Sequence, residues 1–162
     1  MSTGRCTGSL SEQTVTAALR NVSLPGRFQT VQVASVEWIL DIAHNEPAAA
    51  IFAGHVRERP AEGRTFAVVG ILGDKDAGAI ARRVAPVVDH WILCAIPGPR
   101  GTSAEDLAKR MSLPDSRTTL AASVEAGCEV VRAAAKPGDR VLVFGSFHTV
   151  GPALQWLGPA AG

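Results

Sequence analysis

Three polar residues with chemically useful side chains follow a short apolar run in the stretch WILDIAHNEPAAA, residues 38–50. Asp41 offers a carboxylate, His44 an imidazole and Asn45 an amide, and the alanine-rich segment after Pro47 is typical of a helix. An aspartate or asparagine in front of a helix is often only an N-cap, which satisfies free backbone N–H groups. A cap would account for one of the three residues, so the group is also a candidate binding site.

Two further polar groups follow apolar runs later in the chain. Asp74, Lys75 and Asp76 come after FAVVGILG, and Ser146 and His148 come after VLVFG. The alternative for the first group is that Asp76 caps a helix and Lys75 is solvated. Ser146 with His148 suggests a hydrolase, but the nucleophile elbow G-x-S-x-G is absent, which disfavours a catalytic triad.

Two familiar nucleotide-binding motifs are absent from the sequence. The glycines of GILGDKDAG do not fit G-x-G-x-x-G, which disfavours a nicotinamide cofactor. The sequence has no G-x-x-x-x-G-K-[ST] motif and no Gly-Lys pair. If this chain handles ATP, it does not hold the triphosphate with a P-loop of its own.

The polar groups can meet only if the elements between them form one sheet. Strand candidates are residues 28–33, 38–42, 65–70, 90–96 and 140–145, with a weaker one at 118–120. Helix candidates are residues 11–22, 47–59, 76–84, a segment starting at Ser103, 124–135 and 150–157. Several strand candidates are continuous apolar runs, which is typical of strands covered on both faces.

This alternation predicts an α/β fold with a doubly wound, mostly parallel, Rossmann-like sheet flanked by helices. The first two strands follow each other without a helix, so we expect part of the sheet to be antiparallel. In open α/β sheets, ligands bind beyond the carboxyl ends of the strands. All three polar groups are expected at that edge.

Composition excludes several classes of protein. With 162 residues, 46% hydrophobic and 19% charged, the chain fits one globular domain, and its net charge of +1 is too small and too scattered for a nucleic-acid face. No apolar run could span a membrane, and the N-terminus lacks a signal-peptide core. Cys6, Cys94 and Cys128 are far apart, so neither disulfides nor a zinc site is expected. We expect a cytoplasmic protein with reduced thiols.

Four stretches occur together in a familiar order: LPGRF (24–28), ILDIAHN (39–45), VVGILGDKD (68–76) and FGSFHTVG (144–151). They resemble the C-terminal domain of bacterial folylpolyglutamate synthase/dihydrofolate synthase, a relative of the Mur ligases. LPGR followed by D-x-AHN is specific to that superfamily, and DKD with GS-x-H-TVG is typical of the folate branch. The similarity runs from about residue 11 to the end. Ile42 and Glu46 depart from the usual pattern, beside the site rather than in it.

The resemblance implies a two-domain ligase. Its N-terminal P-loop domain, which this chain lacks, would be the partner and would hold most of the pterin site and of the two cofactors, ATP and Mg²⁺. ATP would phosphorylate a carboxylate of dihydropteroate or tetrahydrofolate, and the amine of L-glutamate would attack the acyl phosphate. The present domain would close over its partner and complete the ATP and glutamate sites. No nucleic acid or membrane partner is implied, and we expect a monomer.

The resemblance also implies roles for individual residues. Arg27 would contact the ATP phosphates, which suits a guanidinium that binds phosphate oxygens bidentately, although an interface salt bridge is the alternative. Asp41 would contact the nucleotide, and His44 and Ser146 would lie on the glutamate side. Further candidates for the cleft are Asn45, Asp74, Lys75 and His148. No metal ligand and no residue that is catalytic in this domain alone is expected.

The expected domain division is a flexible lead-in over residues 1–10, the last helix of a preceding domain and a hinge over 11–27, and a Mur ligase-type C-terminal domain over 28–162. Such a domain would be inactive alone. Two rival hypotheses remain: a stand-alone module that binds a nucleotide or an amino acid without catalysis, and another Mur-type amide ligase. The resemblance also implies that folate discrimination lies largely in the other domain. The present sequence therefore does not distinguish between dihydrofolate synthesis, polyglutamate extension and a combination of the two.

Overall fold

The centre of the structure, a computed structural model that describes residues 27–161, is a six-stranded sheet with strand order β1-β2-β6-β3-β4-β5. The strands are β1 (Gln29–Val33), β2 (Val36–Asp41), β3 (Thr65–Val69), β4 (His90–Cys94), β5 (Thr118–Ala121) and β6 (Arg140–Phe144). All neighbouring strands are parallel except β1 and β2. The predicted doubly wound α/β fold with one antiparallel part is therefore confirmed.

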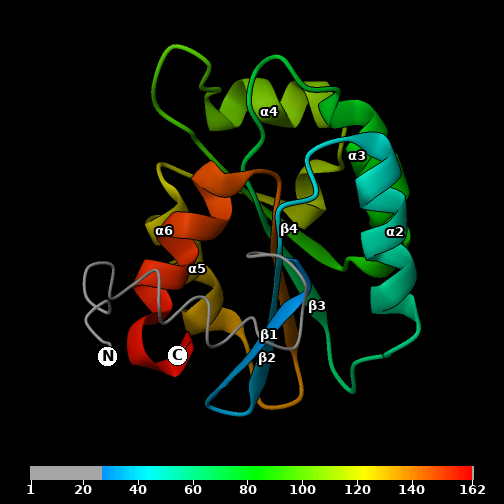
Figure 1. Ribbon diagram of the computed structural model, residues 1–162, viewed down its shortest axis with the longest axis vertical. Helices are drawn as coiled ribbons and strands as arrows, with labels where there is room; N and C mark the ends of the chain where they lie inside the picture. Colours follow the sequence, from blue (N-terminus) through cyan, green and yellow to red (C-terminus); the bar gives the residue numbers. More distant parts are fainter. Residues whose placement is uncertain (1–26, 162) are drawn as a thin grey trace, which may run out of the picture.

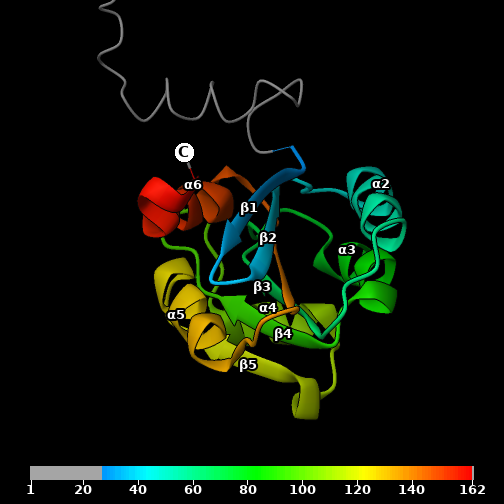
Figure 2. The same cartoon turned by 90° about the horizontal axis from the view of Figure 1, so that it is seen from below.

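Helices cover both faces of the sheet, as Figures 1 and 2 show. The helices are α2 (Glu46–Arg57), α3 (Ala77–Val84), α4 (Ala104–Met111), α5 (Val124–Ala134) and α6 (Phe147–Leu157), with short 3₁₀ turns η2 (Ala85–Val87), η3 (Asp115–Arg117) and η4 (Gly158–Ala161). Helices α5 and α6 pack on one face, and α2, α3 and α4 pack on the other.

Each inner strand contributes alternate side chains to the two cores. In β6, Val141 and Val143 pack with the α5–α6 side, whereas Leu142 and Phe144 pack with the α2–α4 side. Successive side chains of a strand point to opposite faces, so a strand buried on both faces must be apolar at every position. This is the physical basis of the continuous apolar runs in the sequence.

The predicted elements are observed with small shifts in their ends. The helix expected at residues 150–157 begins earlier, at Phe147, because the Ser146 side chain caps it by accepting the backbone N–H of His148. The hairpin between β1 and β2 turns at Ala34 and Ser35, both in the left-handed region with φ of 51° and 64°. The expected lead-in over 1–10, the helix over 11–22, most of the hinge and Cys6 lie outside the described residues.

Two properties of the described residues concern membrane-spanning helices and the reactivity of cysteines. None of the helices they form is long and apolar enough to cross a membrane. Cys94 and Cys128 are buried and free, and burial raises the pKa of each thiol to about 12. These two cysteines therefore act as small core residues rather than as reactive thiols.

Candidate functional site

The sheet register brings the predicted polar groups to one edge. Asp41 and Val69, the last residues of β2 and β3, both pair with Phe144, the last residue of β6. Because these three parallel strands are neighbours and end at the same level, the loops that follow them meet at the upper end of the sheet in Figure 1. This edge carries Asp41, His44, Ser146 and the loop of Lys75 together, as the sequence predicted.

Asp41 is held by the backbone on both sides of its carboxylate. Its Oδ2 accepts the N–H of Phe28 at 2.9 Å, and its Oδ1 accepts the N–H of Ala43 at 2.8 Å. Burial raises the pKa of Asp41 above its usual 3.8, although the two backbone hydrogen bonds and the positive charges of Arg27 and His55 oppose that shift. The carboxylate therefore joins the start of β1 to the loop after β2.

The helix cap that follows β2 is Asn45, not Asp41. The Asn45 side chain accepts the N–H of Ala48 at 2.9 Å, and Pro47 occupies the first turn of α2. The capping alternative is thus correct for Asn45 alone. His44 lies between them, half-buried, with Nδ1 3.1 Å from the carbonyl oxygen of Ile42. Since a carbonyl can only accept, Nδ1 is the donor in this contact.

Ser146 has a structural role at the start of α6. Its buried Oγ accepts the N–H of His148 at 3.1 Å and lies 3.3 Å from Oγ1 of Thr149. The side chain of His148 is exposed and has no hydrogen bond to Ser146. Within the described residues no histidine or carboxylate side chain is bonded to Ser146.

The three charged residues of the loop after β3 differ in their interactions. Asp76 caps α3 by accepting the N–H of Ala79 at 3.0 Å, as the capping alternative predicted. Asp74 is paired with Arg100 at 3.0 Å, and this hydrogen bond lowers the pKa of Asp74. The side chain of Lys75 forms no ion pair within residues 27–161, so its ammonium group stays available at the edge.

Arg27 is exposed at the beginning of the described chain, and its positive charge acts on Asp41. The next residue, Phe28, has a left-handed φ of 47° and packs against Phe52 and His55, with ring centroids 5.9 and 5.4 Å apart. These contacts fix the point where the chain enters the sheet, directly beside Arg27. Sequence reasoning missed Phe28, although the stretch LPGRF contained the signal.

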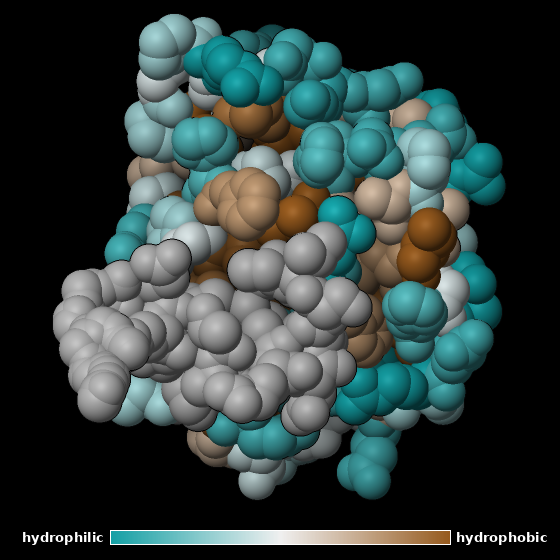
Figure 3. Space-filling view, viewed as in Figure 1, coloured by the Kyte–Doolittle hydropathy of each residue, from teal (hydrophilic) through white to brown (hydrophobic). Residues whose placement is uncertain are grey.

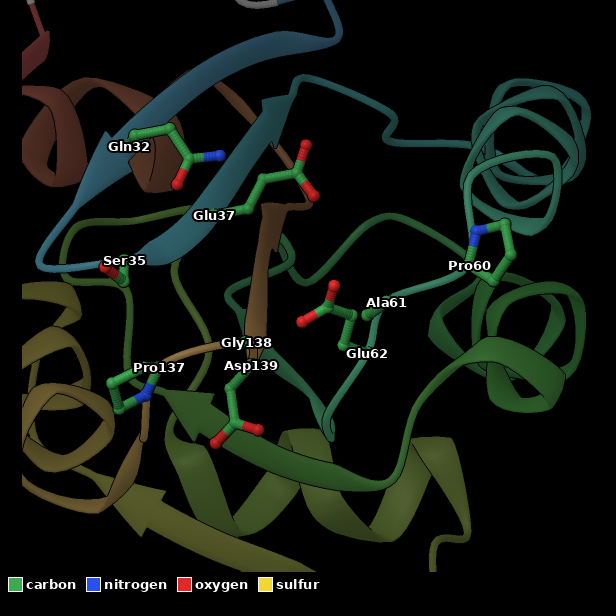
Figure 4. Close-up of a pocket in the computed structure, with 9 residues that line it drawn as sticks. All are labelled: Gln32, Ser35, Glu37, Pro60, Ala61, Glu62, Pro137, Gly138 and Asp139. Atoms are coloured by element: carbon green, nitrogen blue, oxygen red, sulfur yellow. The ribbon is translucent and has the colours of Figure 1, made fainter.

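Two hollows on the described structure lie away from these residues. One, of about 550 Å³, lies at the amino-terminal edge of the sheet and is shown in Figure 4; its lining includes Glu37, Glu62 and Asp139. The other, of about 400 Å³, lies beyond β4 and β5 and is lined in part by Ile96 and Ser123. Neither is lined by Asp41, His44 or Ser146.

The face that contains this edge shows a group of apolar residues between polar ones in Figure 3. Two large apolar side chains stand out on the flanking helices: Phe147 in the first turn of α6 is 63% exposed, and Ile51 in α2 is 62% exposed. No group of three His, Cys, Asp or Glu side chains within residues 27–161 could hold a metal ion.

Comparisons with known proteins agree with this arrangement. A family model described as "Mur ligase, glutamate ligase domain" matches residues 26–147. The dihydrofolate synthase/folylpolyglutamate synthase of Escherichia coli (strain K12) is 38% identical over 146 residues, which are 90% of this chain and 33% of that protein. That of Haemophilus influenzae is 35% identical over 161 residues, 87% of this chain and 37% of that protein.

Solved structures show the same similarity. A bifunctional folylpolyglutamate synthase/dihydrofolate synthase with Mn, AMPPNP and L-glutamate bound matches with a TM-score of 0.76 and 37% identity, covering 83% of this chain and 32% of that one. Escherichia coli FolC in complex with DHPP and ADP matches with a TM-score of 0.74 and 39% identity, over 82% of this chain and 31% of that one. The present chain spans about a third of the length of the curated relatives it matches. It belongs to the family of Mur ligase glutamate ligase domains, and its sequence is homologous to the corresponding part of bacterial dihydrofolate synthase/folylpolyglutamate synthases.

Proposed function

We propose that this chain is the C-terminal domain of an ATP-dependent ligase that joins L-glutamate to dihydropteroate or tetrahydrofolate. The observation that carries the proposal is the carboxyl edge of the sheet, where Asp41 ends β2, His44 follows it and Ser146 follows the adjacent β6 in a glutamate ligase domain. In the reaction, the terminal phosphoryl group of ATP passes to a substrate carboxylate and leaves ADP. The glutamate amine then attacks the carbonyl carbon, phosphate departs, and the amine loses a proton as the amide forms.

Arg27 and Asp41 form the nucleotide side of the proposed site. The exposed guanidinium of Arg27 can bind phosphate oxygens bidentately. An ionised carboxylate has about four acceptor positions, and Asp41 uses two of them on backbone N–H groups. The remaining positions can accept hydrogen bonds from the nucleotide, and the backbone bonds hold the carboxylate in one orientation for that purpose.

His44, Ser146 and Lys75 form the proposed glutamate side. Nδ1 of His44 is bonded to the carbonyl of Ile42, so its Nε2 faces a ligand with one defined tautomer. The Lys75 ammonium supplies positive charge for a dicarboxylate substrate. Asn45, Asp74 and His148 lie around these groups, but Asn45 is committed to capping α2 and Asp74 to pairing with Arg100.

The remaining parts of the proposed active site belong to a second domain. The chain has no P-loop sequence, and residues 27–161 contain no metal-binding cluster, so the triphosphate and Mg²⁺ are assigned to a P-loop domain that faces the carboxyl edge of the sheet. The exposed side chain of Phe147, which directly follows Ser146, gives such a partner an apolar surface to contact at this edge.

A hybrid enzyme tests the proposal directly. The C-terminal third of the Escherichia coli relative is replaced by this chain, and glutamate-dependent release of ADP is measured with dihydropteroate and with tetrahydrofolate. We expect activity with at least one of the two substrates and none with either half alone. A folded hybrid without glutamate-dependent turnover, together with micromolar nucleotide binding by the isolated chain, would instead favour a stand-alone binding module.

A further inference from the structure

One buried hydroxyl group joins the loops that follow β3 and β6. Thr149 is fully buried in α6, and its Oγ1 donates to the carbonyl oxygen of Gly70 at 2.6 Å. The backbone ladder between the two strands ends just before this point, with the N–H of Gly70 bonded to the carbonyl of Phe144 at 3.4 Å. The Thr149 hydroxyl therefore binds the carbonyl of Gly70, the first residue after β3.

The two loops also approach each other closely at this place. Gly145 has a φ of +128°, and a Cβ there would lie 2.1 Å from the carbonyl oxygen of Gly70. A Cβ on Gly70 would lie 2.9 Å from Oγ1 of Thr149. A residue with a side chain is therefore strained at Gly145, and at Gly70 the side chains of Ile96 and Thr149 would have to move to admit one.

Counting protons determines the direction of each hydrogen bond. A hydroxyl has one proton and two acceptor positions, and Thr149 gives its proton to the Gly70 carbonyl. In the 3.3 Å contact between the two hydroxyls, Ser146 must therefore be the donor. Ser146 Oγ also accepts the N–H of His148, which leaves it one free acceptor position and no free proton.

We propose that Thr149 is a positioning residue that orients the Ser146 hydroxyl as an acceptor for the amino group of the incoming amino acid. The part of this inference that concerns the amino acid rests on the proposed function. An ammonium or amine group has N–H donors that match the free acceptor position of Ser146, whereas a carboxylate has none. Through Gly70, Thr149 also holds the loop that leads to Lys75 in a constant position relative to Ser146.

The first test uses the 162-residue chain itself. Thr149→Val removes the hydroxyl and keeps the shape, and Thr149→Ser keeps the hydroxyl. Thr102→Val is the matched control, because the buried Thr102 hydroxyl has no hydrogen-bond partner in the part of the chain that the structure describes. Amide hydrogen exchange is compared between the first turn of α6, at His148 and Val150, and its last turn, at Leu157.

We expect Thr149→Val to speed exchange at His148 by at least about fivefold relative to Leu157 and to speed it less at Val150, since the His148 N–H is bonded to the Ser146 hydroxyl and the Val150 N–H to the Ser146 backbone carbonyl. Thr149→Ser and Thr102→Val should stay within about twofold of the wild type. Unchanged exchange in Thr149→Val, or an equal rise along the whole helix, would show that Thr149 only contributes to packing and would overturn the inference.

The second test uses the hybrid ligase and separates the amino group from the carboxylates. Thr149→Val should raise the KM for glutamate at least about fivefold while the KM for ATP stays within about twofold, and Thr149→Ser should restore the wild-type value. Glutarate, which has both carboxylates but no amine, should inhibit wild type and Thr149→Val equally. An equal loss for glutarate and glutamate would overturn the assigned orientation. A hybrid with no ligase activity would contradict the proposed function, while the exchange experiment would still decide the positioning role.

Discussion

The Oδ2 atom of Asp41 accepts the backbone N–H of Phe28 at 2.9 Å, so the end of β2 holds the entry of the chain into β1. Phe28 has a left-handed φ of 47°, which is unfavourable for a residue with a side chain, and the hydrogen bond helps to keep it there. Arg27 immediately precedes this residue. The position of the proposed phosphate-binding side chain thus depends on a carboxylate that lies in the same proposed site.

This relationship predicts that Asp41→Asn is destabilising, even though asparagine caps helices as well as aspartate does. Asp41 uses each oxygen for a different N–H group, whereas an amide has one acceptor oxygen and must direct its NH₂ group at the other N–H. We expect a loss of about 1–2 kcal/mol in the free energy of unfolding, measured by thermal and urea denaturation. Asn45→Asp is the control, since it keeps the α2 cap and should change stability little; equal stability of the two variants would contradict the prediction.

The pKa of Asp41 gives a second prediction, for acid conditions. Its pKa is raised in the folded state, mainly by burial, so the folded protein binds this proton more readily than the unfolded chain. The Asp41 contribution to the free energy of unfolding should therefore fall as pH rises from 3.8 through the pKa of Asp41 in the folded state. The Asp41→Asn variant has no carboxyl group at this position, so its stability should lack this dependence on pH. NMR titration of the carboxyl carbons should place the midpoint of Asp41 above 3.8 and that of Asp74 below it. A midpoint for Asp41 at or below 3.8 would contradict this account.

The two sides of the proposed site should separate in the kinetics of the hybrid ligase. Arg27→Ala and Asp41→Asn should each lower kcat/KM for ATP at least about tenfold, because each removes a charge-assisted hydrogen bond. His44→Ala should instead raise the KM for glutamate more than the KM for ATP. Steady-state assays that vary one substrate at a time distinguish the two effects. Normal use of ATP by both nucleotide-side variants would mean that Arg27 and Asp41 are structural.

The isolated chain should neither hydrolyse ATP nor form glutamyl amides. Without a P-loop the triphosphate has no anchor here, so we expect ATP to bind more weakly than about 1 mM, which corresponds to less than about 4 kcal/mol. Titration calorimetry and an assay for ADP release with the pure chain check both statements. Glutamate-dependent ADP release by the chain alone would be the contrary result.

Two glycines should respond to alanine in opposite directions. Gly145→Ala forces a Cβ to within 2.1 Å of the Gly70 carbonyl at a positive φ, so this variant should be strongly destabilised. Gly54 lies inside α2, and a Cβ added there would meet no heavy atom within 4 Å apart from its chain neighbours and the helix's own backbone, so Gly54→Ala should stabilise the domain by about 0.4–1 kcal/mol. Thermal denaturation of both variants provides the comparison, and a Gly145→Ala variant as stable as Gly54→Ala would rule out the close approach of the two loops.

The sequence alone determined the class of fold and the edge that carries the site. Continuous apolar runs such as FAVV and VLVF, separated by segments of helical period, are enough to predict a parallel sheet with two covered faces. Polar residues directly after such runs must lie at the carboxyl edge, since the strands are parallel. Asp41, His44 and Ser146 are therefore assigned to one edge by the order of residues along the chain.

Only the tertiary structure decided what each polar residue does there. Whether Asp41 or Asn45 caps α2 depends on where the helix begins, and local preferences for the two residue types are nearly equal. The bonds from Asp41 to Phe28 and from Thr149 to Gly70 join residues 13 and 79 positions apart in the chain. Such contacts depend on the strand order, in which β6 lies between β2 and β3. They also depend on the register, in which Asp41 and Val69 both pair with Phe144 at the ends of the three strands. Order and register arise from packing across the whole sheet, which no local pattern of residues specifies.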